Sequence, residues 1–357
     1  MMKKKIKYAV IGTGSNAEKN HITGYLSLPN VELVAVCDTN REQALRVAQK
    51  YGITKVYSDY KEMLRNEQLD IVSVCTPNFL HAEITIAALK TGANVHCEKP
   101  LAMNGAEARL IAQAKEATGK MVMVGLNNRF TNESMFLKQM IDQGLLGNIY
   151  QAKAGWVRRS GIPGRGTWFT NSKCSGGGVM IDLGVHYLDL VLYFMGLPQP
   201  SVIIGSTYQT FTNTTSRNRN GYKGNPNGIF DVEDSAVGLL QLENGASVNF
   251  EFSWASNIEN DKFYYELLGT KGGASFVNGE LRIFTEQAGT CIDMSPRINP
   301  NIRTLNEFQH FIDCIDNGKQ PLAPTEDGIY MMDIIDAFYD ASSRREPYHF
   351  NKAGVGV

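Results

Sequence analysis

Residues 1–126 alternate short apolar runs with segments of helical periodicity, and this rhythm constrains the fold more than any other feature. The runs are rich in Val and Ile, which is typical of strands buried on both faces of a parallel sheet. Strand, helix and strand in succession predict right-handed crossovers and a doubly wound α/β domain. The expected strands are Ile6–Ile11, Leu33–Cys37, Ile71–Cys75, Asn94–Cys97 and Met121–Val124, and the expected helices are Arg41–Tyr51, Ala82–Thr91 and Ala106–Thr118.

The first expected strand runs into the turn Gly12-Thr13-Gly14-Ser15-Asn16-Ala17, which has the form G-x-G-x-x-A. Gly12 permits a tight turn, Gly14 lets the backbone approach a pyrophosphate, and Ala17 allows close helix–strand packing. The pyrophosphate would lie at the positive N-terminal end of the following helix, so Ser15 and Asn16 join the expected cofactor-binding residues. A glycine-rich turn after any strand matches the same pattern, so the prediction depends on this strand–helix context.

The second expected strand ends at Cys37-Asp38. An acidic residue there accepts the ribose hydroxyls of NAD and repels the 2′-phosphate of NADP, so Asp38 favours NAD. Arg41 follows closely and would stack beside the adenine or tolerate a phosphate. The alternative interpretation is that Asp38 caps the next helix and that Arg41 is a solvated charge.

Two further strand ends point to the same crevice, because ligands of open α/β sheets bind at the carboxyl ends of the strands. Lys99, which lies between a strand end and a proline, is poorly placed as a solvated surface charge. Its alternative role is a structural ion pair, and His81 taken alone is more typical of a helix start than of a catalyst. The cofactor-binding residues expected here are Thr76, Pro77, Asn78, His81, Glu98 and Lys99.

Residues 127–357 differ from the first 126 in their pattern of apolar residues and predict a second, α+β domain. Two domains suit a chain of 357 residues at ~100–200 residues each. In Val248–Trp254 every second residue is apolar, as in a strand with one buried face. Asn244-Gly245 and Asn278-Gly279 are hairpin signals, so we expect an antiparallel sheet with helices on one face. The other expected elements are a long apolar helix, Val179–Phe194, helices at Phe136–Gln143, Leu305–Ile315 and Gly328–Ser343, a strand at Tyr150–Val157, and an exposed Gly/Asn-rich loop over 212–228.

These motifs resemble those of the glucose–fructose oxidoreductase/inositol dehydrogenase (Gfo/Idh/MocA) family, and the likeness covers nearly the whole chain. Its most specific parts are Glu98-Lys99-Pro100 and the D-x-G-x-H pattern from Asp182 to His186. The resemblance implies a Rossmann domain followed by a large open sheet, a nicotinamide cofactor and sugar or polyol chemistry. It also implies dimers or tetramers built through that sheet, and a catalytic trio of Lys99, Asp182 and His186.

The residues themselves support this trio. Asp182 and His186 are four positions apart, so on a helix they share a face. Oxidation of a secondary alcohol needs a nicotinamide over the carbon, a base for the hydroxyl proton and a positive donor for the developing alkoxide. His186, with an ordinary pKa of ~6.5, suits the base and Lys99 suits the donor, while Asp182 would bind a neighbouring hydroxyl or orient the base. Either Lys99 or His186 can take the proton, and we favour His186.

Two other interpretations of this helix stay open. Asp182, His186 and Asp189 could be metal ligands, but three ligands from one helix leave too few for a closed zinc site, so no metal is expected. The three side chains could also form a buried polar face that is satisfied by structural hydrogen bonds.

Residues 156–170 interleave aromatic side chains with arginines and glycines, which suits a mobile loop over a polyhydroxylated ligand. A Trp face packs on the apolar face of a sugar ring, and Arg158 and Arg159 would bind hydroxyls, a carboxylate or a nucleotide phosphate. Trp168 and Asn127 are expected to contact both cofactor and substrate. The alternative is that Trp156 and Trp168 are core residues bordering a flexible loop.

Composition limits the partners and the location. Lys and Arg total 35 and Asp and Glu total 36, so there is no general electrostatic case for binding nucleic acid or an anionic membrane. No apolar run approaches the ~18–20 residues of a membrane span, and the run after the N-terminal lysines is shorter than the ~7–15 residues of a signal core. The six cysteines form no CxxC pair, so a reduced, cytoplasmic protein is expected.

Together these features predict an NAD-dependent oxidoreductase that oxidises a secondary alcohol of a sugar or glycoside, specifically C3 of a glucoside, in a homo-oligomer. One alternative is a redox-neutral glycosidase or lyase that retains its NAD, and another is an inositol or nucleotide-sugar dehydrogenase. A non-catalytic NAD or sugar sensor is the third, and the intact trio argues against it. Accumulation of NADH distinguishes the dehydrogenase from the redox-neutral enzyme.

Overall fold

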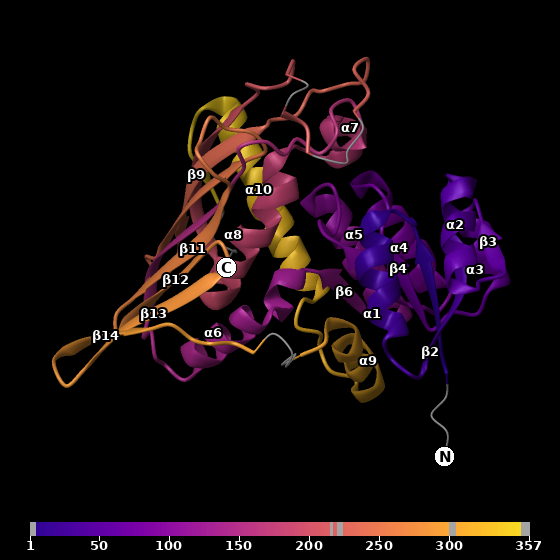
Figure 1. The fold of residues 1–357 in the computed structure, drawn as a ribbon, viewed down its shortest axis with the longest axis horizontal. Helices are drawn as coiled ribbons and strands as arrows, with labels where there is room; N and C mark the ends of the chain where they lie inside the picture. The colour runs from indigo at the N-terminus through magenta and orange to yellow at the C-terminus, as the bar shows by residue number, and fades with distance from the viewer. Residues whose placement is uncertain (1–4, 215–216, 220–223, 300–304, 351–357) are drawn as a thin grey trace, which may run out of the picture. The chain divides into compact units, whose positions relative to one another are not determined.

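The first compact unit is built on a six-stranded parallel sheet. The computed structural model describes residues 5–214, 217–219, 224–299 and 305–350, which fall into two units (Figure 1). The sheet has the order β3-β2-β1-β4-β5-β6, so the strand order reverses between β1 and β4. Its strands are β1 (Ile6–Ile11), β2 (Val31–Cys37), β3 (Lys55–Tyr57), β4 (Ile71–Val74), β5 (Asn94–Glu98) and β6 (Val122–Gly125).

The expected doubly wound α/β domain is confirmed, and all five expected strands are present with ends shifted by at most two residues. The short edge strand β3 was not predicted, because its three residues carry no apolar run: the first is exposed and the other two are half-buried. The helical segments of this unit are η1 (Ala17–Ile22, a π-helix), α1 (Thr23–Leu26), α2 (Arg41–Tyr51), α3 (Tyr60–Asn66), η2 (Asn78–Leu80), α4 (His81–Lys90), α5 (Gly105–Thr118) and α9 (Glu307–Asn317), and the division between the units falls within η3 (Asn127–Phe130).

The units do not follow the chain in order. Leu305–Met332 cluster with the residues up to Asn127, although a single division after residue 126 places them in the second domain. Helix α9 is one part of this segment and packs on the first unit. The ring of Phe308 meets Tyr25 edge-on at 4.9 Å, and the ring of Phe311 lies 5.8 Å from that of His96.

The second unit contains a nine-stranded sheet in the order β14-β13-β12-β11-β7-β10-β9-β8-β15. Only β10 and β7 pair in parallel among its described strands, so the expected mostly antiparallel sheet is confirmed. Its strands are β7 (Ile149–Val157), β8 (Pro200–Tyr208), β9 (Ser235–Leu242), β10 (Ser247–Ser253), β11 (Lys262–Gly269), β12 (Gly272–Val277), β13 (Glu280–Gln287), β14 (Thr290–Met294) and β15 (Tyr348–His349).

Helices cover one face of this sheet. Figure 1 shows α8 (Val185–Phe194) and α10 (Thr325–Arg344) along it. Phe338 of α10 packs on Phe250 of β10, with ring centroids 5.4 Å apart. The remaining helical segments are α6 (Asn132–Asp142), η4 (Trp168–Thr170), α7 (Ser172–Ser175) and η5 (Met180–Gly184).

Local sequence signals of this unit are confirmed where the structure describes them. In β10 Val248, Phe250 and Phe252 are buried, and the residues between them are less so. The Asn-Gly pairs join β9 to β10 and β12 to β13, and Gly245 and Gly279 have φ of 85° and 97°. Of the expected loop over 212–228, residues 215–216 and 220–223 lie outside the described residues.

The expected apolar helix Val179–Phe194 is present but has two parts, a π-helical turn (η5) followed by α8. The helical stretch Ser172–Phe194 has the length and hydropathy of a membrane span, although no single apolar run in the sequence is that long. Its most apolar window is 89% buried inside the structure, so this stretch is a core helix of the second unit.

Candidate active site

The glycine turn lies where its sequence predicts, between β1 and η1. Gly12 has φ of 86°, and a Cβ there would come within 2.5 Å of the Cys75 carbonyl oxygen, so only glycine fits. At Gly14 the space that a Cβ would enter is open. The backbone of Gly14 is therefore accessible to a ligand, as the pyrophosphate prediction requires.

The Asp38 carboxylate is bound to this turn. Its Oδ2 accepts hydrogen bonds from the Thr13 amide at 2.7 Å and from the Thr13 hydroxyl at 2.9 Å. Asn40, not Asp38, caps α2, because its side chain accepts from the Gln43 amide. The capping alternative for Asp38 is therefore wrong, while Arg41 opens α2 as an exposed residue.

His81 connects the two other strand ends. Its buried ring has Nδ1 at 2.6 Å from the Pro100 carbonyl oxygen and Nε2 at 2.9 Å from that of Thr76. Burial lowers the pKa of His81. His81 is the first residue of α4, as expected of a helix-start residue, and its ring lies between the loops that follow β4 and β5, where the neutral form donates to one of the two carbonyls.

The residues beside these loops fit a dinucleotide. Asn78 is buried behind the loop after β4, and Pro77 and Lys99 are half-buried. The buried Thr76 hydroxyl has no hydrogen-bond partner within the part of the chain that the structure describes, so it is available to a ligand. This orphan hydroxyl, the open space over Gly14 and the carboxylate of Asp38 lie at the carboxyl ends of β4, β1 and β2.

Glu98 joins the glycine turn to Lys99. Its Oε1 accepts from Asn16 Nδ2 at 2.5 Å and lies 2.8 Å from His21 Nε2, while Oε2 accepts from the Lys99 amide at 3.1 Å. Burial would raise the pKa of Glu98, but the bond to His21 and the positive charges of His21 and Lys99 lower it to about 2. The side chain of Glu98 thus accepts hydrogen bonds from two other expected cofactor residues, Asn16 and Lys99.

Sequence reasoning did not identify His21. This buried ring lies in η1, and its Nδ1 is 2.9 Å from the Ser73 hydroxyl. Burial lowers its pKa, but Cys75 and Glu98 outweigh this effect and raise it well above the ordinary value. A histidine in a helix after a glycine turn carries no signal that it will meet a carboxylate from another strand.

In the second unit, Asp182 and His186 are accessible on an otherwise buried helix. From Gly177 to Leu192 they are the only residues that are not buried. Asp182 lies in the π-helical turn, a conformation that is frequent at functional sites, and accepts a hydrogen bond from Trp254 Nε1 at 2.9 Å. The two side chains are half-buried, and Asp182 also makes a structural hydrogen bond, as the polar-face interpretation expects.

Asp189, on the same helix, has a structural role. It is 1% exposed, and its two oxygens accept from Arg129 Nε at 2.9 Å and Nη2 at 2.5 Å. The Arg129 guanidinium also lies 4.6 Å from the ring centre of Tyr193. Among the described residues, no group of three His, Cys, Asp or Glu side chains is arranged to hold a metal.

Three of the residues expected to bind substrate, Arg158, Arg159 and Trp168, contact other protein groups of the second unit. Arg158 is 7% exposed, with its guanidinium 4.5 Å above the Trp156 ring, so its charge is turned into the unit. Arg159 is exposed and donates to the Glu259 carbonyl oxygen at 2.8 Å. Trp168 is half-buried and stacks on Phe169 at 3.8 Å.

The remaining residues that the sequence places near the substrate differ in their exposure. Asn127 is exposed at the start of η3. Trp156 is half-buried with its ring 6.0 Å from that of His186, whereas Trp254 is the fully buried tryptophan. The described part of the 212–228 loop lies against the 156–170 segment, since Arg217 donates to the Arg159 carbonyl at 2.9 Å.

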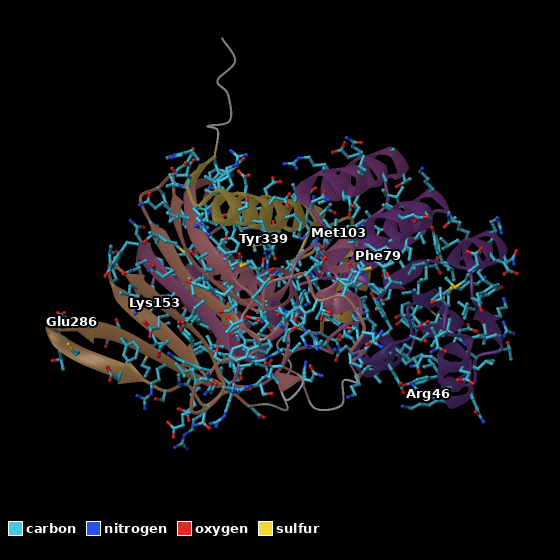
Figure 2. The ribbon with its side chains drawn as sticks, turned by 90° about the horizontal axis from the view of Figure 1, so that it is seen from above. Arg46, Phe79, Met103, Lys153, Glu286 and Tyr339 are labelled. Carbon is cyan, nitrogen blue, oxygen red and sulfur yellow. The ribbon has the colours of Figure 1, made fainter. Side chains whose placement is uncertain are left out.

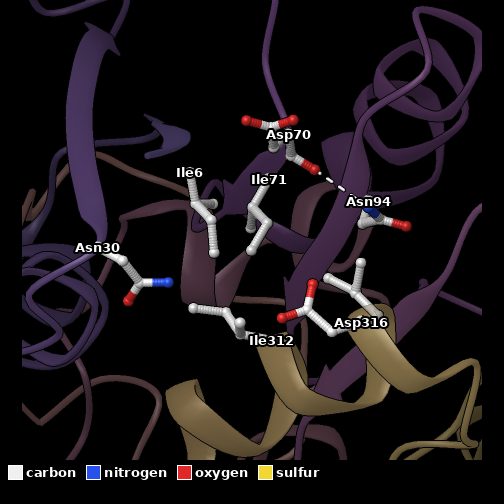
Figure 3. A pocket seen from close by; sticks show the side chains of 8 residues that line it. Ile6, Asn30, Asp70, Ile71, Asn94, Ile312 and Asp316 are labelled. Atoms are coloured by element: carbon white, nitrogen blue, oxygen red, sulfur yellow. Dashed lines mark hydrogen bonds between the residues drawn. The ribbon is translucent and has the colours of Figure 1, made fainter. Parts of the chain in front are cut away.

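A cavity of 270 Å³ occupies the opposite end of the parallel sheet (Figure 3). It lies at the amino ends of β1, β4 and β5, which begin at Ile6, Ile71 and Asn94, and beside Asp316 of α9. The glycine turn follows the carboxyl end of β1, so this cavity is separate from the candidate cofactor site.

Comparison with known proteins agrees with this geometry. The model of the Gfo/Idh/MocA oxidoreductase family with an NAD-binding Rossmann fold matches residues 6–126, and that of its C-terminal alpha/beta domain matches residues 138–350. D-glucoside 3-dehydrogenase of Escherichia coli (strain K12) is 34% identical over 339 residues, 94% of this chain and 95% of that protein. scyllo-Inositol 2-dehydrogenase (NAD(+)) of Bacillus subtilis (strain 168) is 28% identical over 342 residues, 93% of each chain.

Solved structures share the fold. An oxidoreductase domain protein from Kribbella flavida has a TM-score of 0.87 at 23% identity, covering 98% of this chain and 100% of that chain. Levoglucosan dehydrogenase in complex with NADH has a TM-score of 0.85 at 22% identity, with the same coverage.

Proposed function

This chain belongs to the Gfo/Idh/MocA family of NAD-binding oxidoreductases, and we propose that it oxidises the C3 hydroxyl of a glucoside. The family, the enzyme class and NAD as the cofactor are as the sequence predicted. The observation that carries the proposal is the exposure pattern of the helix from Gly177 to Leu192. Only Asp182 and His186 are accessible there, which is expected of side chains that meet a substrate.

The residues of the first unit suit NAD. Gly14 gives the pyrophosphate access to the backbone, the Thr76 hydroxyl can donate to the cofactor, and Asp38 can accept from the ribose. The carboxylate of Asp38 would also repel a 2′-phosphate, which supports NAD over NADP. NAD, when bound, supplies the hydride acceptor of the reaction.

The proposal assigns each member of the trio a separate task. His186 accepts the hydroxyl proton, since imidazole titrates near neutral pH. The ammonium of Lys99 stabilises the developing alkoxide. Asp182, oriented by Trp254, accepts a hydrogen bond from a neighbouring sugar hydroxyl.

The substrate class rests on the E. coli relative, whose name states that it acts on D-glucosides at position 3. Trp156 supports the same class, because it places a half-buried aromatic ring 6.0 Å from the His186 ring, and aromatic faces pack on sugar rings. The named inositol relative shows why cyclic polyols belong in the substrate panel.

The test is a turnover assay with NAD⁺ and a panel of glucosides, free sugars and inositols, with the oxidised carbon identified by NMR. We expect NADH to accumulate with glucosides and the ketone to form at C3. A 3-deoxy glucoside is the matched control and should give no NADH. Release of aglycone without NADH would instead indicate a redox-neutral glycosidase or lyase and would refute the proposal.

The proposal includes a homo-oligomer formed through the nine-stranded sheet. Strand register places Val237, Tyr264 and Val277 in one row on the face opposite α10. Lys153 of β7 projects from that face and pairs with Glu266 at 2.7 Å (Figure 2). Exposed apolar residues in β8, β9, β12 and β13 support association, and they are Ile204, Tyr208, Val237, Val277 and Phe284.

Light scattering of the purified protein tests this part of the proposal. The molar mass should be that of at least a dimer, and Val237→Lys should lower it toward that of the monomer.

Location in the cytoplasm is also part of the proposal. All six cysteines are free thiols, which suits a reducing compartment. Fractionation of cells that make the protein tests this assignment.

A further inference from the structure

The first amides of the helix that carries Asp182 and His186 donate hydrogen bonds to a buried carboxylate from another part of the second unit. Glu233 is 6% exposed and precedes β9. Its Oε2 accepts from the Gly178 amide at 2.9 Å, and its Oε1 accepts from the Met180 amide at 3.0 Å. Its backbone carbonyl accepts from the Val179 amide at 3.2 Å. Three successive amides at the start of the helix therefore bind one residue.

Tyr339 of α10, labelled in Figure 2, also binds the carboxylate of Glu233. Its hydroxyl donates to Glu233 Oε1 at 2.8 Å. Burial raises the pKa of Glu233, whereas its donors favour the ionised form. The positive end of the helix dipole also favours a carboxylate at this place.

Two glycines make this arrangement fit. A Cβ on Gly178 would lie 1.9 Å from the Glu233 carbonyl oxygen, and one on Gly177 would lie 2.1 Å from the Tyr339 hydroxyl. The carbonyl of Gly178 then accepts from the Asp182 amide at 3.0 Å, which is the hydrogen bond that starts the helix. Gly178 therefore binds Glu233 through its amide and Asp182 through its carbonyl.

We propose that Glu233, held by Tyr339, is a positioning residue whose carboxylate fixes the first turn of this helix and so the orientation of Asp182 and His186. The inference rests on the proposed function for its effect on catalysis. Its structural part rests on the hydrogen bonds alone. Because a small misplacement of reacting groups is costly, loosening this turn should lower kcat by about 10- to 100-fold.

The decisive variant is Glu233→Gln. It keeps the length of the side chain, but its amide nitrogen must face a backbone N–H in either orientation: that of Gly178 in one, and that of Met180 together with the Tyr339 hydroxyl in the other. Tyr339→Phe is the milder variant, since it removes one donor and leaves the carboxylate on the two amides. Asp231→Asn is the matched control, because this exposed carboxylate lies two residues away and bonds to Ser172 instead.

Hydrogen exchange followed by mass spectrometry over residues 177–186 tests the contact without any substrate. We expect faster exchange in Glu233→Gln, a smaller increase in Tyr339→Phe and none in Asp231→Asn. Unchanged exchange in Glu233→Gln would overturn the proposal. If that variant does not fold, Tyr339→Phe decides the question by the same criterion.

Kinetics well below the melting temperature of each variant test the positioning role. We expect kcat to fall in Glu233→Gln while the Kd of NADH and the KM of the glucoside change less than twofold. Faster exchange with an unchanged kcat would show a purely structural role and contradict the proposal. If the wild type oxidises no glucoside, the proposed function fails, and the exchange result still decides whether Glu233 fixes the turn.

Discussion

His21 and Glu98, 77 positions apart in sequence, form a buried pair with 2.8 Å between Nε2 and Oε1. The same Glu98 oxygen accepts from Asn16 of the glycine turn, and Lys99 is the next residue. One ion pair therefore connects the cofactor turn with the strand end that carries the expected alkoxide donor.

Because of this pair, the free energy of unfolding should fall both at acidic pH and at basic pH. Neighbouring groups raise the pKa of His21, so its contribution is complete below the ordinary value of ~6.5 and is lost as the pH rises through the raised pKa. The pKa of Glu98 is lowered from 4.5 to about 2, so its contribution is complete above 4.5 and is lost as the pH falls toward 2. We expect His21→Gln to cost about 3–5 kcal/mol of unfolding free energy between these limits and less outside them. Urea unfolding of both proteins across pH measures this, and a pH-independent difference would contradict it.

Asp38 should set the choice of cofactor. Asp38→Asn keeps an acceptor for Thr13 but removes the charge that repels a 2′-phosphate. We expect the ratio of kcat/KM for NAD⁺ to that for NADP⁺ to fall at least about tenfold. A ratio equal to that of the wild type would show that Asp38 serves the turn and not the ribose.

Trp254 should act through Asp182. Trp254→Phe keeps a buried ring but removes the indole N–H that donates to Asp182 Oδ2 at 2.9 Å. We expect kcat to fall about tenfold, because Asp182 loses its orientation, and the unfolding free energy to fall by about 1–3 kcal/mol. The Kd of NADH, measured by fluorescence titration, should not change. A stability loss with full activity would assign Trp254 to packing alone.

The Arg129–Asp189 pair should be structural. Asp189→Asn leaves a buried guanidinium without its countercharge and should cost about 3–5 kcal/mol in denaturant unfolding. Lys61→Met, which breaks an exposed pair with Glu83, is the control and should cost less than about 1 kcal/mol. Equal costs for the two variants would count against a special role for the buried pair.

The sequence predicts the features that depend on local chemistry. Gly12 could be placed because a tight turn after a strand needs a residue that tolerates positive φ. Asp182 and His186 could be paired because their spacing on a helix is fixed. The Asn-Gly hairpins followed from the same kind of local rule.

The features that were missed depend on contacts between distant segments. Trp254 meets Asp182 across 72 positions, and Glu233 meets Met180 across 53, with no local pattern to signal either contact. Asp189 had the spacing of a site residue, but its partner Arg129 lies 60 positions earlier. Helix α9 clusters with the first unit, and periodicity could not indicate this because it identifies an apolar face and not the surface that covers it.

The most direct test of the account is turnover by His186→Ala. With NAD⁺ and a glucoside that the wild type oxidises, we expect the rate of NADH formation to fall by about 10²- to 10⁴-fold. The Kd of NADH should stay at the wild-type value, because the glycine turn, Asp38 and Thr76 all belong to the first unit. Unchanged turnover in His186→Ala would contradict the assignment of the base and, with it, the central claim.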